Sequence, residues 1–242
     1  MQVYGHRGAG GEAPENTVAA CLHAIERGAK YIEIDLRLSS DDQLVVIHDK
    51  TLKRTAGKWG AVRACKASEL SRMDARADGP PWPRQQDCGV PTLEALLKAT
   101  QKLKGYQLEV KPDSKTVLRR IARHLADRFD TPPASDRIVV TSSNFYLHEC
   151  LAELAPHITR GLVILRPEAM EKLGQLGCSY CVMHWSACNP YTVRQLRKAG
   201  MHVSAWTVNA EQMIKNLYKL KVDSVITDYP SMAVPLVAAL ER

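Results

Sequence analysis

Short apolar runs of β type alternate with helix-type patterns along almost the whole chain, and this alternation constrains the fold more than any other feature. The β-type runs are rich in β-branched residues, whereas the helix-type stretches have apolar residues three and four positions apart. The expected strands are Gln2–Tyr4, Tyr31–Leu36, Tyr106–Val110, Arg137–Thr141, Thr159–Ile164, Tyr180–Met183, His202–Trp206 and Ser224–Thr227. The expected helices are Asn16–Arg27, Thr92–Leu103, Lys115–Arg128, Tyr146–Leu154, Pro190–Ala199 and Ala210–Leu220.

About eight successive βα units predict an α/β fold with a parallel sheet. The chain has 242 residues, and one closed barrel of such units takes roughly 250. We therefore expect a TIM (β/α)8 barrel. In such barrels the chemistry lies at the carboxyl ends of the strands, so we expect the functional site there.

One stretch interrupts the alternation. Leu44–Ile47 has the pattern of an extra strand, and the residues from about 49 to 89 hold several prolines, two tryptophans and no clean period. The stretch is too short to carry a core of its own, so we interpret it as an excursion over the barrel mouth. The prediction is a single domain over residues 1–242 with a small insertion at about 49–89, after the second strand.

The formal net charge is +7 and the isoelectric point is near 9.0, which suits nucleic acid, an anionic membrane surface or a small anionic substrate. The densest basic group lies on one expected helix, interleaved with apolar residues at helical spacing, and it comprises Arg119, Arg120, Arg123 and Arg128. No aromatic residues are interleaved there as in single-strand binders. We therefore expect an exposed helix face and no nucleic-acid partner.

The sequence also bears on cellular location. No apolar run reaches the roughly 18 residues that span a bilayer, and the start of the chain lacks the apolar segment of a secretion signal. Seven cysteines are an odd number, in a chain that does not need disulfides to fold. We expect free thiols, no integral membrane segment and a cytoplasmic protein. No feature of the sequence indicates an oligomeric state.

Polar side chains collect where the expected strands end. They are His6 and Arg7 after the first strand, Glu33 and Asp35 on the second, Glu109 and Lys111 on the third, Ser142 and Ser143 after the fourth, and Trp206 on the seventh. Residues two apart on a strand point to the same side, so Glu33 and Asp35 share a face. If these faces point inward, three carboxylates and one ammonium group meet in the barrel mouth.

Buried carboxylates without enough counter-charge indicate a bound cation, and all-oxygen ligands suit Mg²⁺, Ca²⁺ or Mn²⁺ better than zinc. A simpler alternative stays open at this point. Glu33 and Asp35 could lie on an exposed strand face that alternates with Ile32, Ile34 and Leu36.

The polar residues fall into motifs that resemble a known family. Residues 5–9 read GHRGA and residues 13–17 read APENT, and they are followed by Glu33-Ile34-Asp35 and His48-Asp49. Further matches are Glu109-Val110-Lys111-Pro112, Ser142-Ser143, Trp206-Thr207-Val208-Asn209 and Thr227-Asp228. In order and spacing, from residue 5 to residue 228, these motifs resemble the signature of the glycerophosphodiester phosphodiesterases.

The resemblance implies a TIM barrel with an insertion after its second strand. It also implies hydrolysis of small-molecule glycerophosphodiesters to sn-glycerol 3-phosphate and an alcohol, with one divalent cation, Mg²⁺ or Ca²⁺, with Mn²⁺ also compatible. Carried onto the matching positions, it gives the following roles: metal ligands Glu33, Asp35 and Glu109, acid/base residues His6 and His48, phosphate contacts Arg7 and Lys111, and a glycerol-side contact Trp206.

Two other functions compete with this one. A phospholipase D-like enzyme of the same superfamily would favour a secreted, disulfide-bearing chain with an apolar surface for lipid, and the sequence indicates neither. A barrel that only binds glycerophosphate ligands or a protein partner would not need two histidines as an acid/base pair.

Three further features have an ordinary structural interpretation beside a functional one. Cys178 and Cys181 have CxxC spacing, with His184 and Cys188 nearby, but a second CxxC is missing, so we expect buried thiols rather than a zinc or redox site. His184 could be structural or could face the substrate. Asn16 could cap the first helix or contact the substrate.

Overall fold

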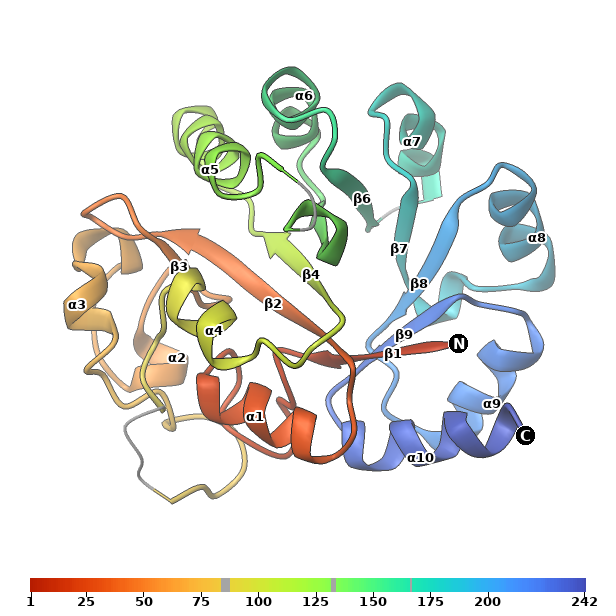
Figure 1. Cartoon of the computed structure of the whole chain (residues 1–242), viewed down its shortest axis with the longest axis horizontal. Helices are drawn as coiled ribbons and strands as arrows, with labels where there is room; N and C mark the ends of the chain where they lie inside the picture. The colour runs from red at the N-terminus through yellow and green to blue at the C-terminus, as the bar shows by residue number, and fades with distance from the viewer. Residues whose placement is uncertain (84–87, 132–133, 166) are drawn as a thin grey trace.

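Eight parallel strands close into a barrel, as the sequence predicts (Figure 1). The computed structural model describes residues 1–83, 88–131, 134–165 and 167–242. The barrel strands are β1 (Gln2–His6), β2 (Tyr31–Leu38), β4 (Gly105–Val110), β5 (Ile138–Ser142), β6 (Thr159–Ile164), β7 (Tyr180–His184), β8 (His202–Trp206) and β9 (Ser224–Thr227). β1 pairs in parallel with both β2 and β9, and these two pairings close the ring.

Helices surround the barrel, and Figure 1 shows α5 to α8 outside the strands. The surrounding helices are α1 (Val18–Glu26), α4 (Leu93–Ala99), α5 (Lys115–Arg128), α6 (Phe145–Leu154), α7 (Lys172–Gln175), α8 (Pro190–Lys198), α9 (Glu211–Lys219) and α10 (Pro230–Leu240). The sequence did not predict α7 or α10. Pro235 lies inside α10. Because an internal proline normally indicates the end of a helix, the sequence around it did not predict one.

The first helix begins later than expected. Thr17, not Asn16, is its N-cap, and the Thr17 hydroxyl accepts a hydrogen bond from the Ala20 amide at 3.1 Å. The prediction that Asn16 caps this helix is therefore wrong, and the Asn16 side chain is available for another contact.

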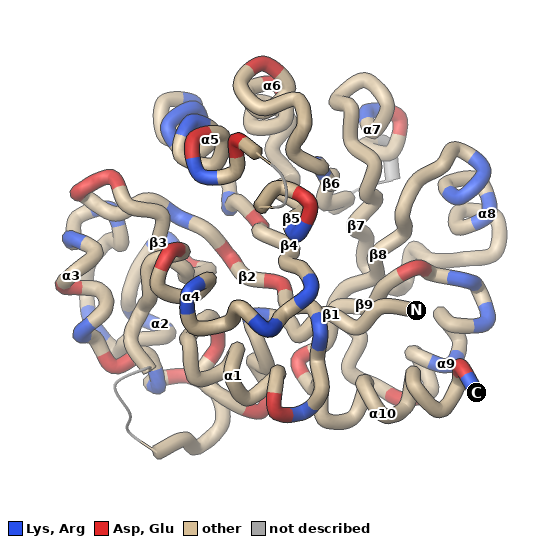
Figure 2. The backbone as a smooth tube through the Cα atoms, in the orientation of Figure 1, with Lys and Arg blue, Asp and Glu red and all other residues tan. Residues whose placement is uncertain are grey.

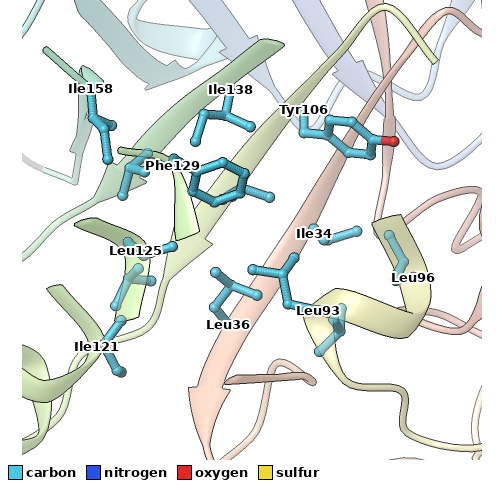
Figure 3. Packing of buried hydrophobic residues seen from close by; sticks show 14 of the residues in the cluster. Ile34, Leu36, Leu93, Leu96, Tyr106, Ile121, Leu125, Phe129, Ile138 and Ile158 are labelled. Carbon is cyan, nitrogen blue, oxygen red and sulfur yellow. The ribbon is translucent and has the colours of Figure 1, made fainter. Parts of the chain in front are cut away.

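The apolar positions of the strands point outward into the helix layer. Ile32, Ile34 and Leu36 are fully buried in one cluster with side chains from the surrounding helices. Figure 3 shows this packing between the strands and helices α4 and α5. Because the outer face of β2 is occupied by this core, its alternate residues must point into the barrel. The alternative of an exposed acidic strand face is wrong, since Glu33 and Asp35 are only 2% and 1% exposed.

The insertion after β2 starts with a short strand, β3 (Leu44–Val46), which pairs antiparallel with β2. Its helices are α2 (Lys53–Ala56), η1 (Val62–Ala64) and α3 (Ala67–Leu70), and residues 84–87 lie outside the described part of the chain. Leu52, Val62 and Leu70 are buried in a separate small cluster. The expectation that this segment is too short for a core is thus wrong, because it packs its own apolar residues against β3.

None of the helices in the described residues is long and apolar enough to cross a bilayer.

The turn after β1 depends on a glycine. Gly8 has φ +85°, and a Cβ there would lie 2.8 Å from backbone atoms of Ala20 and Cys21 in α1. Gly8→Ala should therefore lower the free energy of unfolding by roughly 2–4 kcal/mol, since it adds backbone strain to a clash with a helix. Urea unfolding followed by circular dichroism measures this change.

Gly174→Ala is the matched control, because a Cβ at Gly174 meets no atom within 4 Å. It should leave stability unchanged or raise it by up to about 1 kcal/mol. Equal stability of the two variants would contradict this account of the turn.

Candidate active site

Three carboxylates meet at the carboxyl ends of β2 and β4. Glu33, Asp35 and Glu109 each offer an oxygen atom, and these atoms all lie within 4.8 Å of one another. Figure 2 shows the acidic positions on β2 in an otherwise largely uncharged set of strands. Among the described residues this is the one group of histidine, cysteine and acidic side chains with the spacing of metal ligands.

Glu33 lacks a full set of partners. Its Oε2 accepts a hydrogen bond from the Arg7 amide at 3.2 Å and lies 3.8 Å from His6 Nε2, while its buried Oε1 has no hydrogen-bond partner. Burial, and then the neighbouring charge of Asp35, raise the pKa of Glu33 to about 8. A buried anionic oxygen without a donor is unfavourable, so this position suits a cation.

Asp35, in contrast, is well compensated. Its Oδ2 accepts a hydrogen bond from Asn16 Nδ2 at 2.8 Å, and ion pairs of 3.2 Å and 3.4 Å join it to Arg7 Nε and Lys111 Nζ. Burial acts to raise the pKa of Asp35, but Arg7 and Lys111 outweigh it and hold the pKa below its ordinary value. Asn16, whose Oδ1 also accepts from the Asp35 amide at 3.1 Å, therefore orients a predicted metal ligand.

Glu109 is the most accessible of the three, with a side chain 20% exposed. Its Oε1 lies 2.6 Å from Lys111 Nζ, which also faces Asp35. Burial acts to lower the pKa of Lys111, but Asp35 and Glu109 raise it above the ordinary value, so the ammonium stays charged. The i, i+2 pair predicted from the sequence thus points into the barrel mouth.

His6 closes β1 beside this cluster. Its Nδ1 lies 2.6 Å from Asp228 Oδ1, and Asp228 Oδ2 accepts from Asn209 Nδ2 at 2.6 Å. A carboxylate can only accept, so Nδ1 carries a proton and Nε2 points toward Glu33. The sequence did not predict this role for Asp228 or Asn209. The only signal was their position in motifs after the last two strands.

His48 lies just after β3 and is oriented in the same way. Its Nδ1 is 2.7 Å from Asp49 Oδ1, and its carbonyl accepts from Arg37 Nε at 2.8 Å. Asp49 in turn accepts from Arg54 Nε at 2.8 Å. Both histidines therefore have Nδ1 occupied by a carboxylate, which leaves Nε2 for proton transfer.

Arg7 leaves β1 with a positive φ of 51° and turns back toward the mouth. Its Nη1 donates to both carboxylate oxygens of Glu15 at 3.0 Å. Arg7 and Lys111, the two predicted phosphate contacts, each form an ion pair with Asp35, Arg7 through Oδ2 and Lys111 through Oδ1.

Aromatic side chains form the opposite part of the mouth. Trp206 on β8 and His184 on β7 are register partners, and their rings meet edge to face with centroids 5.6 Å apart. Trp206 packs on a cluster of inward side chains that includes Val163 and Val182. His184 has a structural role, because its Nδ1 accepts a hydrogen bond from the Ser186 amide at 3.3 Å and caps the following helical turn. Its exposed ring also lies beside Trp206, so the substrate-facing interpretation stays open.

The cysteines take no part in this site. None of the seven forms a disulfide, and Cys178 and Cys181 are buried. Burial raises the pKa of the Cys178 thiol to about 11 and that of Cys181 to about 12. These thiols are inert core residues, as predicted.

Comparison with known proteins identifies the family. The model of the glycerophosphoryl diester phosphodiesterase family matches residues 6–232. The chain belongs to this family. A glycerophosphodiester phosphodiesterase of Caldanaerobacter subterraneus subsp. tengcongensis is 30% identical, with 97% of each chain covered.

More distant comparisons agree. The structure of an Oleispira antarctica phosphodiesterase in complex with the product sn-glycerol-3-phosphate has a TM-score of 0.87 and 28% identity, and it covers 98% of this chain and 97% of that one. Human lysophospholipase D GDPD1 is 25% identical over 93% of this chain and 82% of its own length. The chain is therefore a phosphoric diester hydrolase with the TIM barrel fold, as the sequence predicts.

The raised pKa of Glu33 has a consequence for stability without metal. The folded protein binds the proton of the Glu33 carboxyl more tightly than the unfolded chain does. The stabilisation of the folded state that results is complete at low pH and is lost as the pH rises through about 8. In EDTA, Glu33→Gln should remove this loss of stability. At pH values above 8 its Tm should therefore be several degrees higher than that of the wild type.

Thermal melts between about pH 5 and pH 9 test this expectation. Glu153→Gln, which alters an exposed partner of Arg119, is the control and should follow the wild-type curve. If the Tm of Glu33→Gln changed with pH in the same way as that of the wild type, Glu33 would not be the group that binds the proton.

Proposed function

We propose that the protein hydrolyses glycerophosphodiesters, such as glycerophosphocholine, glycerophosphoethanolamine and glycerophosphoglycerol, to sn-glycerol 3-phosphate and an alcohol. The observation that carries this proposal is the three-carboxylate cluster flanked by two histidines with occupied Nδ1 atoms. The Oleispira antarctica structure, which contains sn-glycerol-3-phosphate, supports the nature of the product.

The carboxylates Glu33, Asp35 and Glu109 would hold one divalent cation. The cluster fits such an ion, because Glu33 Oε1 is buried without a donor and because oxygen ligands suit Mg²⁺ or Ca²⁺, with Mn²⁺ also compatible. A cation held there would act as a Lewis acid and stabilise the negative charge that develops at the phosphate.

Arg7 and Lys111 supply the remaining fixed positive charge. A phosphodiester anion repels an incoming nucleophile, so cations on its nonbridging oxygens lower the barrier. Arg7 can contact two oxygens at once, whereas Lys111 acts as a single charged point. Both side chains are positioned before substrate arrives by their ion pairs with Asp35.

His6 and His48 would transfer the protons. One Nε2 accepts the proton of the attacking hydroxyl, either the glycerol 2-hydroxyl or water. The other donates a proton to the departing alkoxide as the bond between phosphorus and oxygen breaks. Attack by water gives sn-glycerol 3-phosphate directly, whereas attack by the glycerol 2-hydroxyl gives a cyclic phosphate, whose ring a water molecule then opens in a second step. Asp228 and Asp49 hold the imidazoles in the tautomer this requires and stabilise the charged ring. Trp206 would line the glycerol side of the mouth.

We also propose that the enzyme works in the cytoplasm, as one domain and without a nucleic-acid partner. Free thiols at all seven cysteines support the location. The basic helix α5 does not offer a free cationic stripe, since Arg119, Arg120 and Arg128 form ion pairs with Glu153, Asp42 and Glu94.

The main test incubates the purified protein with the three glycerophosphodiesters and measures glycerol 3-phosphate, with and without EDTA. We expect EDTA to abolish product and Mg²⁺ or Ca²⁺ to restore it. His6→Ala and His48→Ala should each lower kcat about 10²- to 10⁴-fold while the protein still binds metal, because each removes a proton-transfer group.

Metal-independent turnover would contradict the cation proposal. Near-wild-type kcat in either histidine variant would contradict the acid/base assignment.

A second candidate, hydrolysis of lysophospholipids, is favoured by the distribution of exposed apolar side chains. The large ones at the catalytic end include Phe145 (39% exposed), Leu165 (66%) and Tyr229 (40%), which follow β5, β6 and β9. Such an apolar surface is not evident from the sequence alone. The human relative named lysophospholipase D supports this candidate.

Replacement of Phe145 and Leu165 by serine separates the two candidates, since it removes contact area for an acyl chain. If lysophospholipids are substrates, kcat/KM for lysophosphatidylcholine should fall about tenfold, and that for glycerophosphocholine should not change. Equal effects on both substrates, or no turnover of the lysophospholipid, would exclude this candidate.

A further inference from the structure

We propose that Arg54, which lies in α2 of the insertion, is a positioning residue that holds both His48 and Arg7 in their working orientations. Neither the sequence motifs discussed above nor the strand-end pattern gave Arg54 a role. Its guanidinium contacts three carboxylates from three separate segments of the chain: Glu15 after β1, Asp49 after β3, and Asp78 within the insertion. The inference rests on the proposed function, from which it takes the roles of His48 and Arg7.

The first link runs through Asp49 to His48. Asp49 Oδ2 accepts from Arg54 Nε at 2.8 Å, while Asp49 Oδ1 lies 2.7 Å from His48 Nδ1. The carboxylate is therefore fixed from one side by the guanidinium and fixes the imidazole on the other. When Arg54 is removed, the Asp49 carboxylate can rotate. The His48 ring is then no longer held in one orientation, and its Nε2 no longer points toward the substrate.

The second link runs through Glu15 to Arg7. Arg54 Nη2 and Nη1 donate to Glu15 Oε1 and Oε2, both at 2.7 Å, in a paired arrangement. Arg7 Nη1 donates to the same two oxygens at 3.0 Å. Glu15 is thus shared between two guanidinium groups.

This sharing affects the phosphate contact. With Arg54 present, Arg7 neutralises only part of the charge on Glu15. Without Arg54, Glu15 loses two of the four hydrogen bonds that fix it, so it no longer holds Arg7 Nη1 in a fixed position and Arg7 binds the phosphate less well. The two links predict separate kinetic effects: loss of the Asp49 link lowers kcat, and loss of the Glu15 link raises KM.

The single variants test this division. Asp49→Asn should lower kcat with little change in KM, and Glu15→Gln should mainly raise KM. Arg54→Gln should do both, with an overall loss in kcat/KM of about 10- to 100-fold. Arg54→Lys should recover part of the loss, because one ammonium can serve only one of the two carboxylates at a time.

Coupling between the residues distinguishes positioning from a general loss of structure. Because Arg54 acts on His48 only through Asp49, the double variant Arg54→Gln, Asp49→Asn should have a kcat close to that of the lower single variant. In Arg54→Ala, added guanidinium should restore part of the turnover. Mn²⁺ binding and Tm are measured for every variant, and we expect both to stay near wild type.

Arg76→Gln is the matched control. Arg76 lies in the same insertion and also binds a carboxylate, that of Asp74. Its guanidinium donates to Asp74 and to the Trp82 carbonyl rather than to Glu15 or Asp49, so the substitution should leave kcat and KM unchanged. An Arg76→Gln loss equal to that of Arg54→Gln would overturn the proposal, since the effect would then belong to the insertion as a whole.

The remaining outcomes are separable. If His48→Ala loses turnover but Arg54→Gln keeps wild-type kcat and KM, the positioning role of Arg54 is wrong and the proposed function stands. If the kcat losses of Arg54→Gln and Asp49→Asn multiply in the double variant, Arg54 does not act through Asp49 and the inference fails. If His48→Ala itself keeps its activity, the proposed function fails first.

Discussion

The closed parallel barrel leaves the charged residues of its strands no access to solvent on the outside, and the rest of the site depends on this constraint. Helices bury the outer face of β2 through Ile32, Ile34 and Leu36. Glu33 and Asp35, which alternate with them, must point inward and are almost fully buried. Buried charges need partners, so the mouth gathers Arg7, Lys111 and Asn16 around Asp35 and leaves Glu33 Oε1 as the position for a cation.

The same constraint divides the mouth into two parts. The ends of β1, β2 and β4 carry the charged groups, and the ends of β7 and β8 carry the aromatic rings of His184 and Trp206. A glycerophosphodiester has a matching division between its anionic phosphate and its less polar alcohols. The insertion after β2 adds a third group to the mouth, the His48 imidazole, which no barrel strand supplies. Asp49 and Arg54, also from the insertion, orient this ring.

The sequence predicted those parts of the structure that follow from local patterns. The alternation of strands and helices predicts the barrel. The period of two places Glu33 and Asp35 on one strand face, and it does the same for Glu109 and Lys111. The sequence could not show that Asp228 holds His6, because those residues are 222 positions apart and meet only when β9 pairs with β1. Helix α10 was missed because Pro235 mimics a helix end. Neither interpretation of Asn16 anticipated its contact with Asp35, which lies 19 positions away on β2.

We propose that the inward carboxylates hold one divalent cation and that turnover depends on this ion. Titration of the metal-free protein with Mn²⁺, followed by electron paramagnetic resonance and by glycerol 3-phosphate release in the same samples, tests it most directly. The account predicts one bound Mn²⁺ per chain, a rate that rises in proportion to occupancy, and loss of both in Glu33→Gln. Full activity before any Mn²⁺ binds, or undiminished binding in Glu33→Gln, would contradict it.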